Sequence, residues 1–343
     1  NPLIWTLLIT SISTMTGITM SSNHWLLSWM GLELNTLCIL PIIMKPNHPR
    51  ATEATTKYFL MQATAAAVIL CATTLNAWQT GHGTISNTHM PTTTTLLTIA
   101  IALKLGLAPT HLWYPEVMQG STIMTALIIS TWQKIAPLAL LMMIHNHLNT
   151  NLLLTLGLIW AAIGGWGGKT QLTTRKIMAF SSIAHMGWLV TALSLNLALT
   201  TLTMIIYIMM TSAIFNFLST TPTKTISDTG TAWSMSPTLT TMTMLTLISL
   251  AGLPPLTGFM PKWLILKELT TLPLTSLLLL MTSLPSLFFY TRLAYFTTIT
   301  APPTTTNTEY KWRFNTNTKP NMTLMTAFAL LLLPLTPLLY NTT

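Results

Sequence analysis

The chain has 343 residues, of which half are hydrophobic and only 6% are charged, whereas a soluble domain is about 25% charged. This composition excludes an ordinary soluble globular protein and indicates an integral membrane protein. The formal net charge of +9 does not predict nucleic-acid binding, because the basic residues are scattered between apolar runs and form no single water-facing patch. The two cysteines, Cys38 and Cys71, lack a ligand spacing, so we expect neither a disulfide nor an iron–sulfur cluster.

Long apolar runs predict one all-α integral membrane domain over residues 1–343. Helices are favoured because backbone groups in lipid must bond within their own segment, and the runs are about twice as long as barrel strands. The N-terminal run has no charged leader and is interpreted as a first span, not as a signal peptide. We expect eleven spans, at about 2–20, 24–45, 57–78, 95–113, 123–145, 151–168, 176–195, 199–219, 237–268, 272–298 and 322–340.

The basic residues are distributed unevenly over the connections between these spans and the span ends beside them. One of them, Lys267, falls opposite the N-terminal side, and three others lie deep within spans. The positive-inside rule therefore predicts that the N-terminus lies on the side where the protein was made and the C-terminus across the membrane. Eleven basic residues fall on the N-terminal side: Lys45, Arg50, Lys57, Lys169, Arg175, Lys176, Lys224, Arg292, Lys311, Arg313 and Lys319.

Two of the predicted spans are interrupted by glycine and proline. The fourth contains KLGLAP at 104–109 and the ninth contains AGLPPLTGFMPK at 251–262. Because proline removes a backbone hydrogen bond, each span is expected to be two half-helices around an unwound link. The interruptions are five spans apart, which predicts two inverted five-helix repeats, about 2–145 and 151–298, followed by one C-terminal helix at about 322–340.

Four ionisable residues are predicted at or near membrane depth. Glu33, Lys104 and Lys134 are central in spans two, four and five, roughly 13 Å from either interface at 1.5 Å per residue, and Lys262 lies close to the second interruption. A charged group at the membrane centre costs roughly 2.5–3.5 kcal/mol on insertion scales, so such groups normally face partners or water.

One interpretation of these residues is a static buried ion pair between Glu33 and Lys104. The other is proton transport, because a single membrane-depth acid cannot neutralise three lysines, and a lysine that alternates between protonated and neutral forms is a proton carrier. We expect transport roles for Lys104, Lys134 and Lys262.

Histidines and the remaining acids give weaker indications. His185 in span seven is either a hydrogen-bonded packing residue or a relay member, and His111 is either a relay from Lys104 or an interfacial side chain. Glu53 and Glu116 fall in predicted connections, where most charges are simply solvated.

No cofactor site is predicted. GGWGGKT at 164–170 resembles a phosphate-binding loop, but Ile163 stands where the first glycine is required, and no strand precedes the segment. Close helix packing explains these small residues better. No dinucleotide-binding or metal-ligand pattern occurs, so the chain is not expected to bind a redox cofactor.

Amino-acid usage indicates where the gene resides. Methionine occurs 22 times, but valine occurs three times and aspartate once. A G-poor coding strand, read with a code that gives methionine an extra codon, would produce this usage. Animal mitochondrial genes have both properties.

Six blocks, in this order, resemble the vertebrate mitochondrial NADH–ubiquinone oxidoreductase chain 2 family, the antiporter-like membrane subunits of respiratory complex I. They are WMGLELN, RATEATTKYFLMQATA, LKLGLAPTHLWYPEVMQG, STWQKIAPL, RKIMAFSSIAHMGW and LAGLPPLTGFMPKW. The resemblance implies a proton path through Glu33, Lys104, Lys134 and Lys262. Several antiporter-like relatives end this path at a glutamate, where this chain has a lysine.

The resemblance also implies a location and partners. The chain would pump protons from matrix to intermembrane space in the mitochondrial inner membrane, with its N-terminus on the matrix side. Partners would be membrane lipids and the other core and accessory subunits, including neighbouring antiporter-like subunits, and the flavin and iron–sulfur clusters would reside on those subunits. The residues alone leave two alternatives open: a free-standing cation/proton antiporter, and a scaffold subunit without its own proton path.

Overall fold

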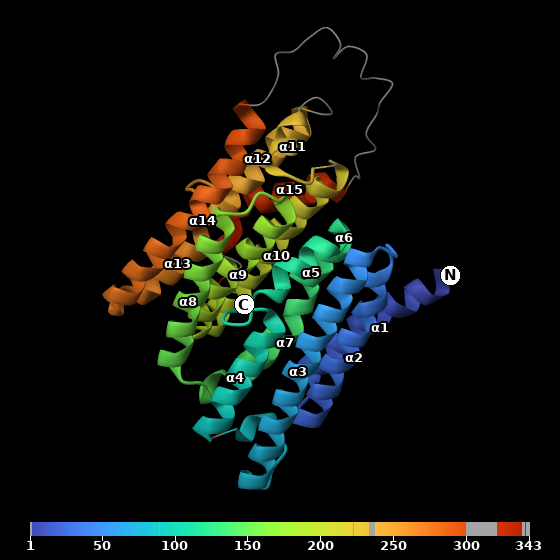
Figure 1. Ribbon diagram of the computed structural model, residues 1–343. Coiled ribbons are helices and arrows are strands. Elements are labelled where there is room, and N and C mark those ends of the chain that lie inside the picture. The colour runs from blue at the N-terminus through green and yellow to red at the C-terminus, as the bar shows by residue number, and fades with distance from the viewer. Residues whose placement is uncertain are drawn as a thin grey trace. The chain divides into compact units, whose positions relative to one another are not determined.

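The computed structural model describes residues 2–88, 90–221, 223–232, 237–299, 321–337 and 340. The regular secondary structure in these residues is helical, apart from two isolated backbone bridges. The chain forms two compact units, Asn1–Thr155 and Leu156–Thr343. The expected all-α fold is confirmed. Figure 1 shows the helices of each unit running side by side.

Unit 1 contains seven described α-helices. α1 packs on α2, α2 on α3, and α3 on both α4 and α5, while α7 contacts α1, α2 and α4. Their bounds are α1 Pro2–Ser21, α2 Trp25–Met44, α3 Pro49–Thr80, α4 Pro91–Leu105, α5 Trp113–Gly120, α6 Ile123–Ser130 and α7 Trp132–Met143, with short 3₁₀ turns at Ile85–Asn87 and His145–His147.

Unit 2 is built around α9, which is buried along almost its whole length. Helix α9 packs on α10, α13 and α14, and α10 also contacts α12 and α15. The bounds are α8 Thr150–Lys169, which begins at the end of unit 1, α9 Thr174–Leu193, α10 Leu197–Thr220, α11 Ile226–Thr231, α12 Pro237–Ala251, α13 Phe259–Glu268, α14 Pro273–Ile299 and α15 Asn321–Leu331, with 3₁₀ turns at Leu269–Thr271 and Leu333–Leu335.

Local sequence explains several helix ends. The imidazoles of His24 and His48 accept hydrogen bonds from backbone N–H groups in the first turns of α2 and α3, which satisfies donors that a helix N-terminus leaves unpaired. Pro49 and Pro91 occupy first-turn positions, where a missing N–H costs nothing.

One short helix, α11, was not predicted from the sequence. Its capping box joins Thr225 and Asp228: the Thr225 hydroxyl accepts from the Asp228 N–H, and the Asp228 carboxylate accepts from the Thr225 N–H. The bond from the Thr225 backbone, with a further contribution from its side chain, lowers the pKa of Asp228 below its usual range.

Among the described residues, eight helical segments are long and apolar enough to cross a membrane, and two shorter apolar helices accompany them. The two expected interruptions explain part of the difference between these eight segments and the eleven predicted spans. Span nine is divided into α12 and α13, and neither half has full length. Predicted span four, at 95–113, is cut short at the end of α4, and α5 begins only at its last residue, Trp113. The count of eleven spans stays a prediction.

The two breaks have the same backbone design. Helix α4 ends before Gly106 (φ 70°) and α12 ends before Gly252 (φ 82°). In each case the glycine N–H donates three residues back, to Leu103 or Ser249, and the next N–H donates five residues back. This is a Schellman-type ending, in which a left-handed glycine allows the last carbonyls to be satisfied.

A second feature recurs in both units. In unit 1, Trp25 N–H donates to the Gly83 carbonyl, and the Ile85 N–H returns to Asn23, joining the α1–α2 link to the α3–α4 link. In unit 2, the same two-bond bridge joins the α8–α9 link to the α10–α11 link, through 172–174 and 224–226.

The glycine-rich segment 164–168 packs tightly within unit 2. A Cβ on Gly164 would lie 2.4 Å from the backbone nitrogen of Ala184 in α9, and one on Gly167 would lie 2.4 Å from the Phe180 ring. The interpretation of these glycines as packing residues is therefore confirmed.

Candidate functional site

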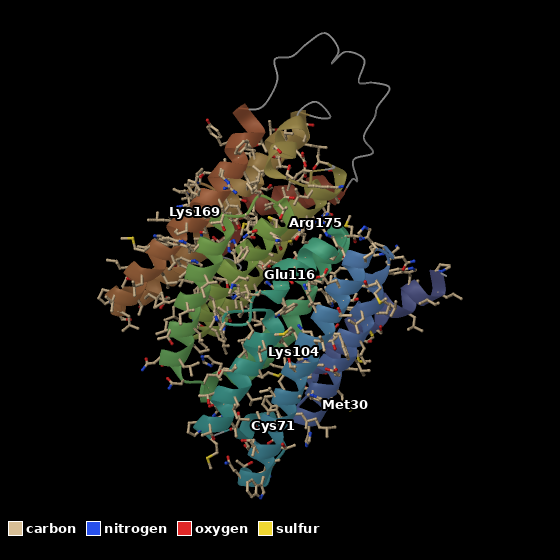
Figure 2. The ribbon with its side chains drawn as sticks, in the orientation of Figure 1. Met30, Cys71, Lys104, Glu116, Lys169 and Arg175 are labelled. Atoms are coloured by element: carbon tan, nitrogen blue, oxygen red, sulfur yellow. The ribbon has the colours of Figure 1, made fainter. Side chains whose placement is uncertain are left out.

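A polar pocket within unit 1 has an empty volume of about 370 Å³, part of which is open to the outside, and two of the candidate site residues line it. Lys104 from the end of α4 and Lys134 from α7 both line it. Polar neighbours from α2, α3 and α7 complete the lining, among them Asn35, Gln62 and Gln133. Figure 2 shows Lys104 among the helices of this unit.

Glu33 and Lys104 form the membrane-depth pair that the sequence predicts. Lys104 Nζ lies 3.9 Å from Glu33 Oε2, and the lysine side chain is 1% exposed against 24% for the glutamate. Neither atom has a hydrogen-bond partner among the described residues. The separation is within ion-pair range but too long for a hydrogen bond. At an effective dielectric constant of about 20, unit charges so placed attract by about 4 kcal/mol.

The break beside Lys104 is held in place by a side chain from α3. Gln62, itself buried, donates its amide hydrogen to the Lys104 carbonyl at 3.0 Å. A helix end leaves its last carbonyls without helical partners, so Gln62 satisfies one of them and fixes the backbone that carries the lysine. The tight turn also brings Gly106 against the Trp113 ring, where an added Cβ would lie 3.0 Å from Trp113 Cζ2.

Lys134 occupies the other side of the cavity and is 2% exposed. Its Nζ lies 5.0 Å from the centroid of the Tyr114 ring on α5, a distance at which a cation is attracted to an aromatic face. Tyr114 in turn stacks edge-on with Trp113, and Trp113 with Tyr58 of α3. An aromatic cluster therefore connects α3, α5 and Lys134.

Lys262 lies in unit 2, in the turn of α13 that follows the second break. Its Nζ donates to the carbonyl of Ala251, the last residue of α12, at 2.8 Å, and stands 5.9 Å from the Trp188 ring. Gly252 lies directly beneath the side chain, since an added Cβ would approach Nζ to 2.9 Å. The ammonium group thus caps the negative end of a half-helix.

His185 shares a cavity of about 360 Å³ with Lys262. Its Nε2 lies 3.3 Å from the Tyr290 hydroxyl of α14, and its ring lies 5.7 Å from that of Tyr207. His185 therefore lines the same pocket as Lys262, and its closest described contacts are with the two tyrosines. His111 lies in the link between α4 and α5 and is half-buried.

Sequence reasoning missed two polar groups in unit 1. Glu53 and Glu116 were expected in connections, but Glu53 belongs to α3, which begins at Pro49, and Glu116 belongs to α5. Both carboxylates lie 2.5 Å from Lys57 Nζ. The four-residue spacing of Glu53 and Lys57 could have indicated an intrahelical pair, whereas the contact with Glu116 depends on how α5 packs.

The second missed group is a pair of amides. Asn35 of α2 and Gln133 of α7 exchange two side-chain hydrogen bonds, of 3.0 and 2.9 Å. Nothing in the local sequence of either helix connects these two residues.

Comparison with known proteins shows where the chain belongs. Residues 22–289 match the profile of the family described as NADH:quinone oxidoreductase/Mrp antiporter, and residues 287–340 match that of the NADH dehydrogenase subunit 2 C-terminus. NADH-ubiquinone oxidoreductase chain 2 of Salmo salar is 52% identical over 98% of this chain and 97% of the relative, and that of Gallus gallus is 51% identical over 94% of each. The chain belongs to the NADH-ubiquinone oxidoreductase chain 2 family. The resemblance noted in its six sequence blocks is confirmed.

Two solved structures have a similar fold. A chain of respiratory complex I from Thermus thermophilus superposes with a TM-score of 0.83 at 26% identity, over 96% of this chain and 79% of that one. A chain of the Mrp complex from a Dietzia species superposes with a TM-score of 0.77 at 16% identity, over 87% and 61%, which shows a shared fold alone. Chain 2 family membership makes this a multi-pass membrane protein with an antiporter-like fold.

Proposed function

We propose that Glu33, Lys104 and Lys134 are the residues through which unit 1 binds and releases protons, within a membrane subunit of the respiratory NADH:ubiquinone oxidoreductase. One observation carries this assignment. Lys104 is buried at the broken end of α4, and its Nζ is within ion-pair range of Glu33 without forming a hydrogen bond. Such a pair is sensitive to a small movement or a protonation change of either partner.

The cavity supports transfer between the two lysines. Lys104 and Lys134 line one space of about 370 Å³ together with amide and aromatic groups. A polar space of this kind holds water where two to four polar partners are present, and water connects proton donors to acceptors. When Glu33 stabilises the charged form of Lys104 less, the proton moves toward Lys134.

We propose that unit 2 is a second copy of the same design and that Lys262 continues the path there. The matching glycine breaks at 106 and 252 and the matching two-bond bridges support this repeat. His185 is a relay member in this proposal, since it shares a cavity with Lys262 and contacts the Tyr290 hydroxyl. His111, in the first link, is a relay between Lys104 and the membrane surface.

The chain carries these protons from the mitochondrial matrix to the intermembrane space. Its N-terminus faces the matrix and its C-terminus faces the intermembrane space, as the eleven basic residues on one side and one on the other indicate. The flavin and iron–sulfur clusters belong to partner subunits. Among the described residues no group of three or more His, Cys, Asp or Glu side chains is arranged to hold a metal ion.

Co-migration distinguishes this function from a free-standing antiporter. In mild detergent the chain should migrate with a flavin-containing assembly, together with neighbouring antiporter-like subunits. A chain that migrates alone and exchanges cations for protons in vesicles would support the antiporter instead.

Replacing Glu33 tests the proton path itself. Glu33→Gln keeps the size of the side chain but removes the charge that faces Lys104, so we expect the assembled complex to lose coupled turnover by roughly ten-fold or more, since proton-transfer groups typically contribute 10²–10⁴-fold. The measurement is proton output per NADH oxidised in proteoliposomes. Glu268→Gln makes the same substitution at the exposed end of α13 and serves as the matched control. Normal proton output from an assembled Glu33→Gln complex would leave the chain with a scaffold role.

A further inference from the structure

Two side-chain amides tie α2 to α7 inside unit 1. The Asn35 amide donates to Gln133 Oε1 at 3.0 Å, and the Gln133 amide donates to Asn35 Oδ1 at 2.9 Å. Asn35 is 2% exposed. The two bonds close a hydrogen-bonded ring between residues that are 98 positions apart in the sequence.

The backbone around Gln133 is irregular on both sides. Helix α6 ends at Ser130, and α7 begins after Thr131, whose ψ of −70° departs from a regular helix. Pro137 has no N–H, so the helical bond that would return to the Gln133 carbonyl is missing. This turn of α7 therefore has fewer internal hydrogen bonds than a continuous helix. The bonds from Asn35 hold it from outside.

The pair connects the segments that carry two of the proposed proton carriers. Glu33 lies two residues before Asn35, and Lys134 directly follows Gln133. Both amides line the same cavity as Lys104 and Lys134. An amide neither gains nor loses a proton in the range where carboxylates and amines titrate. Its donor and acceptor atoms therefore stay the same when its neighbours gain or lose a proton.

We propose that the Asn35–Gln133 amide pair is a non-titrating clamp that positions Lys134 relative to α2. Asn35 and Gln133 are positioning residues: they hold the irregular turn of α7 so that the Lys134 ammonium stays in the cavity with Lys104 while charge moves. The clamp rests on the proposed function, because it matters only where Lys134 carries protons.

An exchange of the two side chains tests the clamp. Asn and Gln differ by one methylene, so Asn35→Gln combined with Gln133→Asn keeps both hydrogen bonds and the total length of the bridge. Gln133→Met and Asn35→Leu each remove the bonds at similar volume. We expect coupled NADH oxidation in assembled Gln133→Met to fall by roughly 10- to 100-fold, because a misplacement of about 1 Å in a reacting group can cost about 10²-fold, and we expect the exchanged pair to restore it.

Two comparisons separate the possible outcomes. Asn216→Leu removes an amide from membrane helix α10 in unit 2 and is expected to leave proton output unchanged. Lys134→Met is expected to lower it. Defective pumping by Lys134→Met together with normal pumping by Gln133→Met and Asn35→Leu would overturn the clamp and leave the proton path standing. Normal pumping by Lys134→Met would overturn the proton path itself. Should the single variants not assemble, the exchanged pair decides: normal assembly and output support the clamp, and a failure of either overturns it.

Discussion

Lys104 shows how one residue acquires a chemical role from its position. It stands two residues before the glycine that ends α4, its backbone carbonyl is held by Gln62, and its ammonium faces Glu33 at 3.9 Å. A charge at this depth is costly without a partner. The residue is therefore stable in either protonation state only as long as its surroundings adjust with it.

Arginine and methionine at this position separate a proton carrier from a static ion pair. Lys104→Met removes the titrating group, and Lys104→Arg keeps the charge but cannot release the proton. We expect both variants to assemble and to lose coupled turnover by a similar factor, roughly ten-fold or more. Proton output per electron in proteoliposomes is the measurement. Lys267→Arg, at the exposed end of α13, is the control, and an assembled Lys104→Arg complex that pumps at the normal ratio would contradict the assignment.

At the scale of elements, the two broken helices depend on a glycine in the left-handed conformation. Gly106→Ala places a Cβ at φ 70° and 3.0 Å from Trp113 Cζ2, which we expect to destabilise unit 1 by about 1–2 kcal/mol, the cost of a left-handed residue with a Cβ. Thermal unfolding of the assembled complex is the measurement.

The control is Gly17→Ala, because an added Cβ there meets nothing within 4 Å on the exposed side of α1. Replacing a helical glycine by alanine should be neutral or stabilising by up to about 1 kcal/mol. Equal melting temperatures for the two variants would show that the turn at Gly106 does not require a glycine.

An ion pair joins α5 to α3 at the surface of unit 1. Lys57 binds two carboxylates at the same distance, one on its own helix and one on α5. We expect Glu116→Gln to increase hydrogen exchange of the α5 backbone amides at low salt. At high salt the pair in the unmodified chain is already screened, so the two chains should exchange at more similar rates. Glu53→Gln is the matched variant, since it removes only the contact within α3. The effect should be small, because half-exposed ion pairs are screened by solvent; equal exchange in both variants would show that the pair does not hold α5.

For the whole molecule, the distribution of basic residues predicts the topology in the membrane. The connections at 45–57, 169–176 and 299–321 should face the matrix. The structure narrows the first of these to 45–48, because α3 begins at Pro49, and most of the third lies outside the described residues. Protease or antibody access in inner-membrane vesicles of known sidedness measures the orientation. Exposure of the 299–321 segment on the intermembrane side would exclude either the eleven spans or the proposed orientation.

The sequence by itself determined the class of the protein and its interrupted helices, and it predicts the membrane depth of its charged residues. Composition excludes a soluble domain, the glycine and proline residues in 104–109 and 251–262 predict two broken helices, and the distance of Lys104 from the ends of its predicted span follows from the helical rise. These properties depend on the chain alone and on the lipid around it.

Only the tertiary structure decided which polar groups meet. The polar side chains of α2 and α7 indicate which face of each helix points inward, but not which residue of another helix they meet. The rotation and crossing of the helices place Asn35 against Gln133, bring Glu116 to Lys57 and set Lys134 over Tyr114. The Glu33–Lys104 pair was predicted from the sequence, and the structure supplies its separation of 3.9 Å. These contacts join residues far apart in the chain, and side-chain packing between helices, not local sequence, determines them.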